Sequence, residues 1–245
     1  MTSVVLVHGW GGSFATTWQQ SGFSALLEDA GRDVIGVDLL GHGTAPRPHA
    51  PEAYADLTLR IEEALPSEPV DAVGFSLGAL TLLRLAVRAP ERFSRIVLAG
   101  IGRNVFDRDT SGAQRIAEGL DAIRGGAELG SLEQTVRLFV QYAQQPGNDL
   151  DALTAIMKRP GGPQLDRETL AGVTCPVLVV VGDEDYVYPA DELAGAFPDG
   201  RCVTLPRVCL LYTSDAADDT QFVGGGGGAG GGWWGGGGGG GGGGG

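Results

Sequence analysis

The sequence predicts an α/β fold built on a mostly parallel, doubly wound sheet. Strand-length apolar runs alternate with helix-forming segments along most of the chain. The runs are continuously apolar, which is typical of parallel strands buried on both faces. Glycine-rich and polar loops follow several of these strands, and such loops gather at the carboxyl edge of a parallel sheet, where ligands bind.

Six β-branched and aliphatic runs are expected to form the strands: residues 3–7, 33–38, 70–73, 96–100, 176–181 and 201–205. Helices are expected between them, at residues 23–30, 52–65, 77–87 and 189–197. Residues 103–170 contain no strand pattern and carry three further helical stretches, at 111–123, 131–144 and 149–157.

The third expected strand runs into Gly74-Phe75-Ser76-Leu77-Gly78, which fits the pattern G-x-S-x-G. A strand–turn–helix context of this kind is what a nucleophile elbow requires. The serine takes a strained backbone conformation that exposes its hydroxyl, and the flanking glycines remove side chains that would clash. The pattern therefore predicts a reactive serine at position 76.

Other loops carry matching signals. The first strand ends in His8-Gly9-Trp10-Gly11-Gly12, the second leads into Asp38-x-x-Gly41-x-Gly43, and the fifth leads into Gly182-x-x-Asp185. In this order and spacing, the motifs resemble those of the α/β-hydrolase family over residues 3–207. The resemblance implies a sheet of the α/β-hydrolase type with a helical cap over the active site.

The resemblance also implies roles for individual residues. Ser76 would be the nucleophile and Asp185 the acid that orients a catalytic histidine, with Asp183 as the alternative acid. The backbone N–H groups of Leu77 and Trp10 would form the oxyanion hole. The motif-supporting positions are His8, Gly9, Gly74 and Gly78.

The histidine of the triad is missing from its expected place. The family carries it in the loop after the last strand, and no histidine follows Leu205 here. Residues 208–245 instead resemble the translation of a sequencing adapter followed by a run of G base calls. We therefore expect a chain truncated before the histidine, a disordered non-native tail, and a printed chain that is close to inactive.

These observations predict a hydrolase domain over residues 1–207 and a separate tail over 208–245. The domain would consist of a core, residues 1–102 and 171–207, and a helical cap over about 103–170. Four apolar cap residues are candidates for the substrate pocket, although packing of the cap on the sheet would also explain them: Phe106, Phe139, Tyr142 and Met157.

The remaining polar residues are expected to be structural. The ring of His8 is expected to bond nearby backbone, and His49 to be solvated between prolines. His42 is the alternative base, but the family places the base elsewhere. Asp38 is expected to fix a tight turn as a hydrogen-bond acceptor. No metal-ligand cluster and no cofactor motif is visible.

The formal net charge of −13 disfavours nucleic acid and anionic membrane surfaces as partners. No signal peptide or membrane span is visible. Cys175 and Cys202 are expected to be buried thiols rather than a disulfide, which favours a cytoplasmic enzyme. Alanine is abundant and Lys158 is the only lysine, which suggests a GC-rich, bacterial genome.

The sequence thus predicts a serine hydrolase that cleaves a small-molecule carboxylic ester, thioester or lactone through an acyl-enzyme. Two other interpretations stay open. One keeps the fold but changes the reaction, to a carbon–carbon bond hydrolase or perhydrolase. The other is a non-catalytic module that binds a ligand or partner. Dehalogenase and epoxide hydrolase chemistry is disfavoured, because this fold uses an aspartate at the elbow for those reactions.

Overall fold

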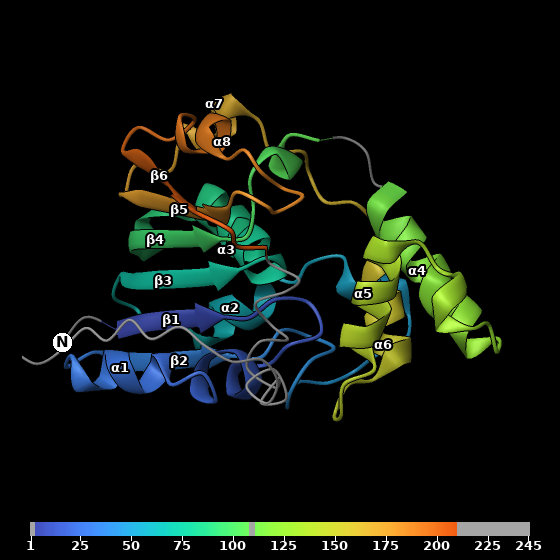
Figure 1. The fold of residues 1–245 in the computed structure, drawn as a ribbon. Coiled ribbons are helices and arrows are strands. Elements are labelled where there is room, and N and C mark those ends of the chain that lie inside the picture. Colours follow the sequence, from blue (N-terminus) through green and yellow to red (C-terminus); the bar gives the residue numbers. More distant parts are fainter. Residues whose placement is uncertain (1–2, 108–110, 210–245) are drawn as a thin grey trace, which may run out of the picture.

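The computed structural model describes residues 3–107 and 111–209. Six strands form one parallel sheet in the order β2-β1-β3-β4-β5-β6 (Figure 1). The strands are β1 (Ser3–Val7), β2 (Asp33–Val37), β3 (Val70–Phe75), β4 (Phe93–Ala99), β5 (Val177–Gly182) and β6 (Gly200–Leu205). The predicted fold class is confirmed, and the predictions for residues 210–245 lie outside the described residues.

The strand order reverses at β1. The chain leaves β1 toward β2 on one side, and β3 then pairs on the other side of β1. In open parallel sheets this switch point opens a crevice at the carboxyl ends of the two strands, where ligands bind. The loop after β1 and the G-x-S-x-G turn after β3 both lie at this crevice.

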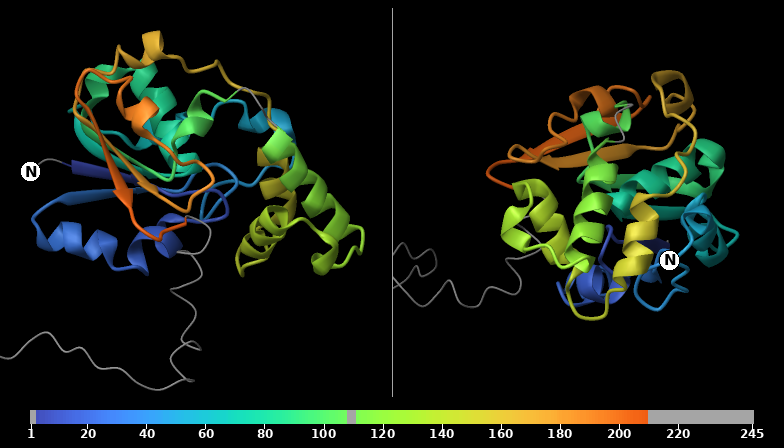
Figure 2. Two further views of the ribbon diagram at one scale, coloured as in Figure 1. Left: turned by 45° about the horizontal axis from the view of Figure 1, so that its top comes forward. Right: turned by 90° about the vertical axis from the view of Figure 1, so that its right-hand side faces the viewer.

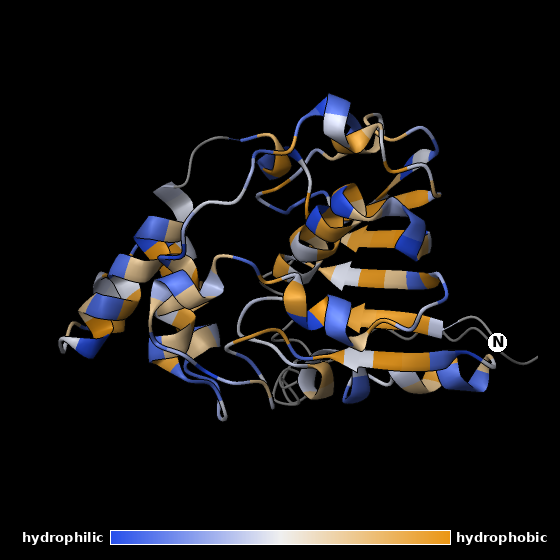
Figure 3. Cartoon of the chain, turned by 180° about the vertical axis from the view of Figure 1, so that it is seen from behind, coloured by the Kyte–Doolittle hydropathy of each residue, from blue (hydrophilic) through white to orange (hydrophobic). Residues whose placement is uncertain are grey.

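Helices cover both faces of the sheet. One face carries α1 (Phe23–Asp29), where Val4, Leu6 and Trp18 form a small core. The other face carries α2 (Leu59–Ala64), α3 (Leu77–Arg88) and α8 (Asp191–Ala194), which share the large core with Val5 and Val7. The inner strands are apolar along most of their length (Figure 3), as burial on both faces requires, whereas the edge strand β6 is largely exposed.

The prediction of one continuous helix over residues 52–65 is wrong. The structure has a short 3-10 helix at Pro51–Tyr54 and then α2 from Leu59. The interruption has a local cause, since the Asp56 carboxylate accepts hydrogen bonds from the Thr58 N–H at 2.9 Å and from its hydroxyl. Such a side-chain-to-backbone turn competes with helix formation.

A helical insertion separates β4 from β5. It contains α4 (Ser111–Arg124), α5 (Gln134–Ala143), α6 (Leu150–Met157) and the short α7 (Arg167–Leu170). The first three helices group together beyond the arrowheads of β1, β3 and β4 (Figure 1). The left view of Figure 2 shows the same separation, and its right view shows these helices in front of the sheet. The insertion therefore lies at the edge of the sheet that carries the motif-bearing loops.

Within the described part of the chain, no helix has the length and apolar character needed to cross a membrane. Cys175 and Cys202 are free thiols, as expected, but they are half-buried rather than buried. Burial still raises the pKa of both thiols, so neither is an activated nucleophile.

Candidate active site

Ser76 lies at the turn between β3 and α3 with a backbone φ of 51°. A positive φ is uncommon for a residue with a Cβ and marks a strained turn. The N–H of Ser76 donates to the Ala99 carbonyl at 2.8 Å, which ties the turn to the end of β4. Its side chain does not cap α3 and is partly exposed. This is the geometry of a nucleophile elbow.

The glycines of the motif allow α3 to pack against the strand ends. A Cβ added at Gly78 would lie 2.4 Å from the carbonyl oxygen of His8, and one at Gly74 would lie 2.7 Å from Ala79 Cα. Neither separation is possible without movement of the backbone. The elbow therefore needs glycine at both positions, and α3 begins directly beside the end of β1.

The loop after β1 approaches the serine closely. A Cβ added at Gly9 would lie 3.3 Å from Ser76 Cβ. The next residue, Trp10, is buried, and its backbone N–H has no backbone acceptor among the described residues. The N–H of Leu77 lies in the first turn of α3, where a helix offers no internal acceptor. Two backbone donors thus flank the serine without backbone partners in the part of the chain that the structure describes.

The loop after β5 separates the two candidate acids. Asp183 is exposed, and its carboxylate accepts a hydrogen bond from the backbone N–H of Arg207 at 2.6 Å. Asp185 is buried, and its carboxylate accepts the N–H of Val187 at 3.3 Å. Asp183 therefore links the loops after β5 and β6, whereas Asp185 is the carboxylate held inside the protein.

The helical insertion contacts the loop after β1 and the loop after β5. The ring of Phe139 on α5 lies 5.7 Å from the ring of Trp10 and 6.5 Å from that of Tyr186, centroid to centroid. Asn148 donates from its side-chain amide to the carbonyl of Gly11 at 2.9 Å, and the Tyr142 ring packs against the same glycine. The insertion therefore covers the loop that follows β1.

The four candidate pocket residues take different positions. Phe139 and Tyr142 lie over the loop after β1, whereas Phe106 is half-buried and packs against the large core. Met157 lines a cavity of about 990 Å³ between α3, α4 and the segment after α6. Leu77 lines the same cavity, which therefore begins beside the serine turn; Ser76 itself is not part of its lining.

Residues 2–207 match the sequence model of the alpha/beta hydrolase fold. The chain belongs to the α/β-hydrolase family. A pimeloyl-[acyl-carrier protein] methyl ester esterase from Chromobacterium violaceum is 29% identical to it, over 83% of this chain and 85% of the relative. A 2-hydroxymuconate semialdehyde hydrolase from a Pseudomonas species is 33% identical, over 50% of this chain and 41% of the relative. These relatives support a hydrolase.

Solved structures agree on the fold of this α/β-hydrolase. The enol-lactonase from Burkholderia xenovorans superimposes with a TM-score of 0.60 at 22% identity, over 91% of this chain and 89% of the other. The two proteins share the architecture of the sheet and its helices.

Two of the three histidines of this α/β-hydrolase are buried and form hydrogen bonds with the backbone of the loops after β1 and β2. The Nδ1 of His8 donates to the Gly9 carbonyl at 2.7 Å, and its Nε2 accepts the Leu39 N–H at 3.1 Å. His42 packs on the ring of His8, with its Nδ1 donating to the Leu40 carbonyl. Burial lowers the pKa of His8, and burial together with the neighbouring His8 lowers the pKa of His42 to about 3.

A base with so low a pKa is a weak proton acceptor, so His42 is unsuited to activating the serine. Asp38 holds the same region together by accepting the N–H groups of Phe14 at 2.7 Å and Thr44 at 2.8 Å, as the sequence predicts. Burial alone would raise the pKa of Asp38, but these hydrogen bonds outweigh burial and lower it.

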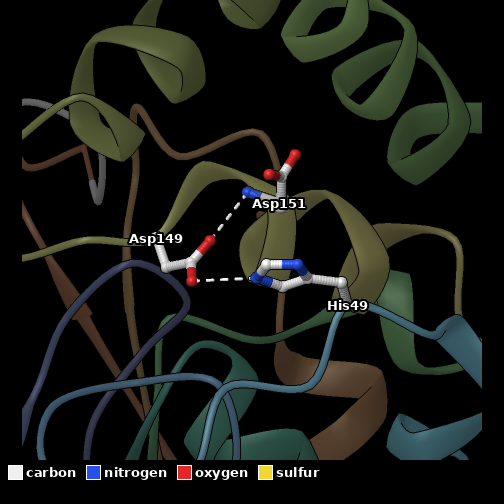
Figure 4. Close-up of side chains that lie close together, drawn as sticks. All are labelled: His49, Asp149 and Asp151. Atoms are coloured by element: carbon white, nitrogen blue, oxygen red, sulfur yellow. Dashed lines mark hydrogen bonds and ion pairs between the residues drawn. The ribbon is translucent and has the colours of Figure 1, made fainter.

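The third histidine joins the α/β-hydrolase core to the insertion. His49 is exposed, but its Nε2 lies 3.0 Å from Oδ2 of Asp149 (Figure 4), so it is not simply solvated as expected. Ligand atoms of His49, Asp149 and Asp151 lie within 4.8 Å of one another. Each carboxylate already has protein partners, because Asp149 caps α6 and Asp151 pairs with Arg124 at 2.7 Å.

Sequence reasoning missed the contacts between the insertion and the loops. Asn148 and Gly11 are 137 positions apart, and Trp10 donates from its indole N–H to the carbonyl of Leu153, 143 positions away. Neither pair belongs to a motif. The sequence offered only one signal, the polar side chain of Asn148 near the start of a helix. Such side chains are too common for this one to identify Gly11 as its partner.

Proposed function

We propose that this α/β-hydrolase is a serine hydrolase that cleaves a small-molecule carboxylic ester, thioester or lactone through an acyl-enzyme at Ser76. One observation carries the proposal: the strained serine lies beside two backbone N–H groups, of Trp10 and Leu77, that lack backbone partners among residues 3–107 and 111–209. Donors placed in this way stabilise the oxyanion that develops when a serine attacks a carbonyl.

The remaining steps require a base and an acid. In such a reaction a base takes the proton from Oγ as it attacks the carbonyl carbon, and then returns the proton to the leaving group. We assign the orientation of that base to Asp185, and its burial in the loop after β5 supports the assignment. The three histidines of the printed chain bond elsewhere, to Gly9 and Leu39, to Leu40, and to Asp149.

We therefore expect the printed chain to be a slow hydrolase that retains the serine, the acid and the oxyanion donors but lacks a positioned base. Removal of a triad member lowers the rate by several orders of magnitude. Free cysteines are in keeping with a reducing compartment, which supports a cytoplasmic location.

Chemical rescue tests the proposal. We expect added imidazole to raise the rate of 4-nitrophenyl acetate hydrolysis beyond its effect in solution, and the Ser76→Ala variant to lack this excess. The Asp183→Asn variant, altered in the exposed acid, is the control and is expected to keep the excess. An equal imidazole response in Ser76→Ala would refute an acyl-enzyme at this serine.

A second activity is favoured by the similarity to 2-hydroxymuconate semialdehyde hydrolase, a relative that matches half of this chain. A carbon–carbon bond hydrolase would use the same serine turn with a different substrate. Incubation with a 2-hydroxy-6-oxo-dienoate and with 4-nitrophenyl esters, each under imidazole rescue, separates the two. Faster Ser76-dependent turnover of the dienoate would favour the carbon–carbon activity.

A further inference from the structure

The cavity beside the serine turn is lined by one face of α3. Leu77, Leu80, Thr81 and Arg84 lie along this wall at helical spacing, and the opposite wall comes from α4 and residues 157–165. The first part of the cavity is apolar, because Leu77, Leu80 and Met157 contribute to it. Basic and acidic side chains also line the cavity.

Four basic side chains line the cavity, and two of them are neutralised by carboxylates. Arg88 pairs with Asp56 at 2.9 Å and with Glu62 at 2.7 Å. Lys158 pairs with Asp121 at 2.6 Å. These two residues have their counter-charges within the protein.

Arg84 and Arg159 differ from them. Each guanidinium donates to a backbone carbonyl at 2.6 Å, Arg84 to Pro163 and Arg159 to Ile156. Among the residues that the structure describes, neither forms an ion pair with a carboxylate. Arg84 also packs against Gly162, where an added Cβ would lie 2.6 Å from its Nη1.

The two charges lie close enough to affect each other. Burial, and then the charge of Arg84, lowers the pKa of Arg159 to about 10. Burial also lowers the pKa of Arg84, which Asp56 partly offsets. A bound anion would relieve both the desolvation and the mutual repulsion, and guanidinium groups match the geometry of carboxylate oxygens.

We propose that Arg84 and Arg159 bind a carboxylate at the far end of an elongated acyl substrate. This rests on the proposed function, in which the scissile carbonyl lies at Ser76. Arg84 lies eight residues after Ser76 in α3, which corresponds to about 12 Å along the helix axis. The apolar wall between the two positions suits a methylene chain.

A monoanion fits the site better than a phosphate dianion. Asp56 and Glu118 also line the cavity, and their negative charge would oppose a second charge on the ligand. The proposal therefore commits to a carboxylate, and octyl phosphate serves as the competing probe.

Binding calorimetry tests the proposal without requiring turnover. We expect octanedioic acid monomethyl ester to bind at least ten-fold more tightly than methyl octanoate. Arg84→Gln and Arg159→Gln should each abolish this preference. Lys158→Gln alters a paired cation on the same cavity wall, so it should keep the preference. Thermal melts confirm that each variant is folded, and Arg84→Lys provides a second, more conservative change.

Equal affinity for the acid and the neutral ester would overturn the proposal, as would an unchanged preference in both arginine variants. Tighter binding of octyl phosphate would overturn the assignment of a carboxylate. A carboxylate preference without any Ser76-dependent response to imidazole would leave the anion site standing and refute the serine hydrolase. The failures of the two proposals are therefore distinguishable.

Discussion

The ring of Phe139 packs on the ring of Trp10, with their centroids 5.7 Å apart and their planes inclined at 58°. Phe139 belongs to the helical insertion, and Trp10 follows the first strand of the sheet. The same phenylalanine also contacts Tyr186 in the loop that carries Asp185. One side chain of the insertion thus contacts both loops to which we assign catalytic groups.

This arrangement predicts that Phe139→Ala reduces both stability and Ser76-dependent hydrolysis. Truncation of a buried phenylalanine destabilises a protein by about 3 kcal/mol. The matched control is Ile116→Ala, which alters another buried residue of the insertion, on α4. Chemical denaturation and imidazole-rescued rates provide the two readouts. Equal loss of rate in both variants would show that only stability matters.

Two helix glycines allow a matched test of the elbow. Gly78→Ala would place a Cβ 2.4 Å from a backbone oxygen, and overpacking of this kind costs about 1–3 kcal/mol or more. Gly112→Ala on α4 meets no atom from another part of the described chain within 4 Å, and alanine is favoured over glycine in helices by up to about 1 kcal/mol. We therefore expect opposite changes in the free energy of unfolding. Similar changes would contradict the close packing of α3 on β1.

Much of the sheet could be predicted from the sequence because each strand is a continuous apolar run between turn signals. The strand expected at 70–73 extends to Phe75, since Gly74 and Phe75 still pair with β4. The serine turn was recognisable because its glycines and spacing carry the motif.

Other features had no local signal. The pairing of His49 with Asp149 joins residues 100 positions apart, and each of them looks like an ordinary exposed polar residue in the sequence. Whether Arg84 and Arg159 pair with carboxylates depends on which acids reach them in three dimensions. These contacts form only when the insertion packs against the core, so the hydrophobic periodicity of the sequence does not predict them.

The buried His42 predicts sensitivity to acid. Its pKa falls from 6.5 to about 3 on folding, so the unfolded chain binds more protons than the folded one between these values. Stability should therefore decrease as the pH falls below 6.5, by up to about 1.4 kcal/mol per pH unit for this one group. His42→Gln should reduce the slope of unfolding free energy between pH 6.5 and 4.5, and His49→Gln should not. An unchanged slope in His42→Gln would show that folding does not lower the pKa of His42.

His49 predicts a pH effect of the opposite sign. Its hydrogen bond to Asp149 raises the pKa of the imidazole above 6.5. The contact is therefore complete below pH 6.5 and is lost as the pH rises through the pKa of the folded state. We expect NMR titration to place that pKa above the ordinary value, and Asp149→Asn to return it toward 6.5. Asp121→Asn, which changes an acid paired with Lys158 and Arg124, is the control and should shift it less. An unperturbed His49 pKa in the parent chain would contradict a charged link between the core and the insertion.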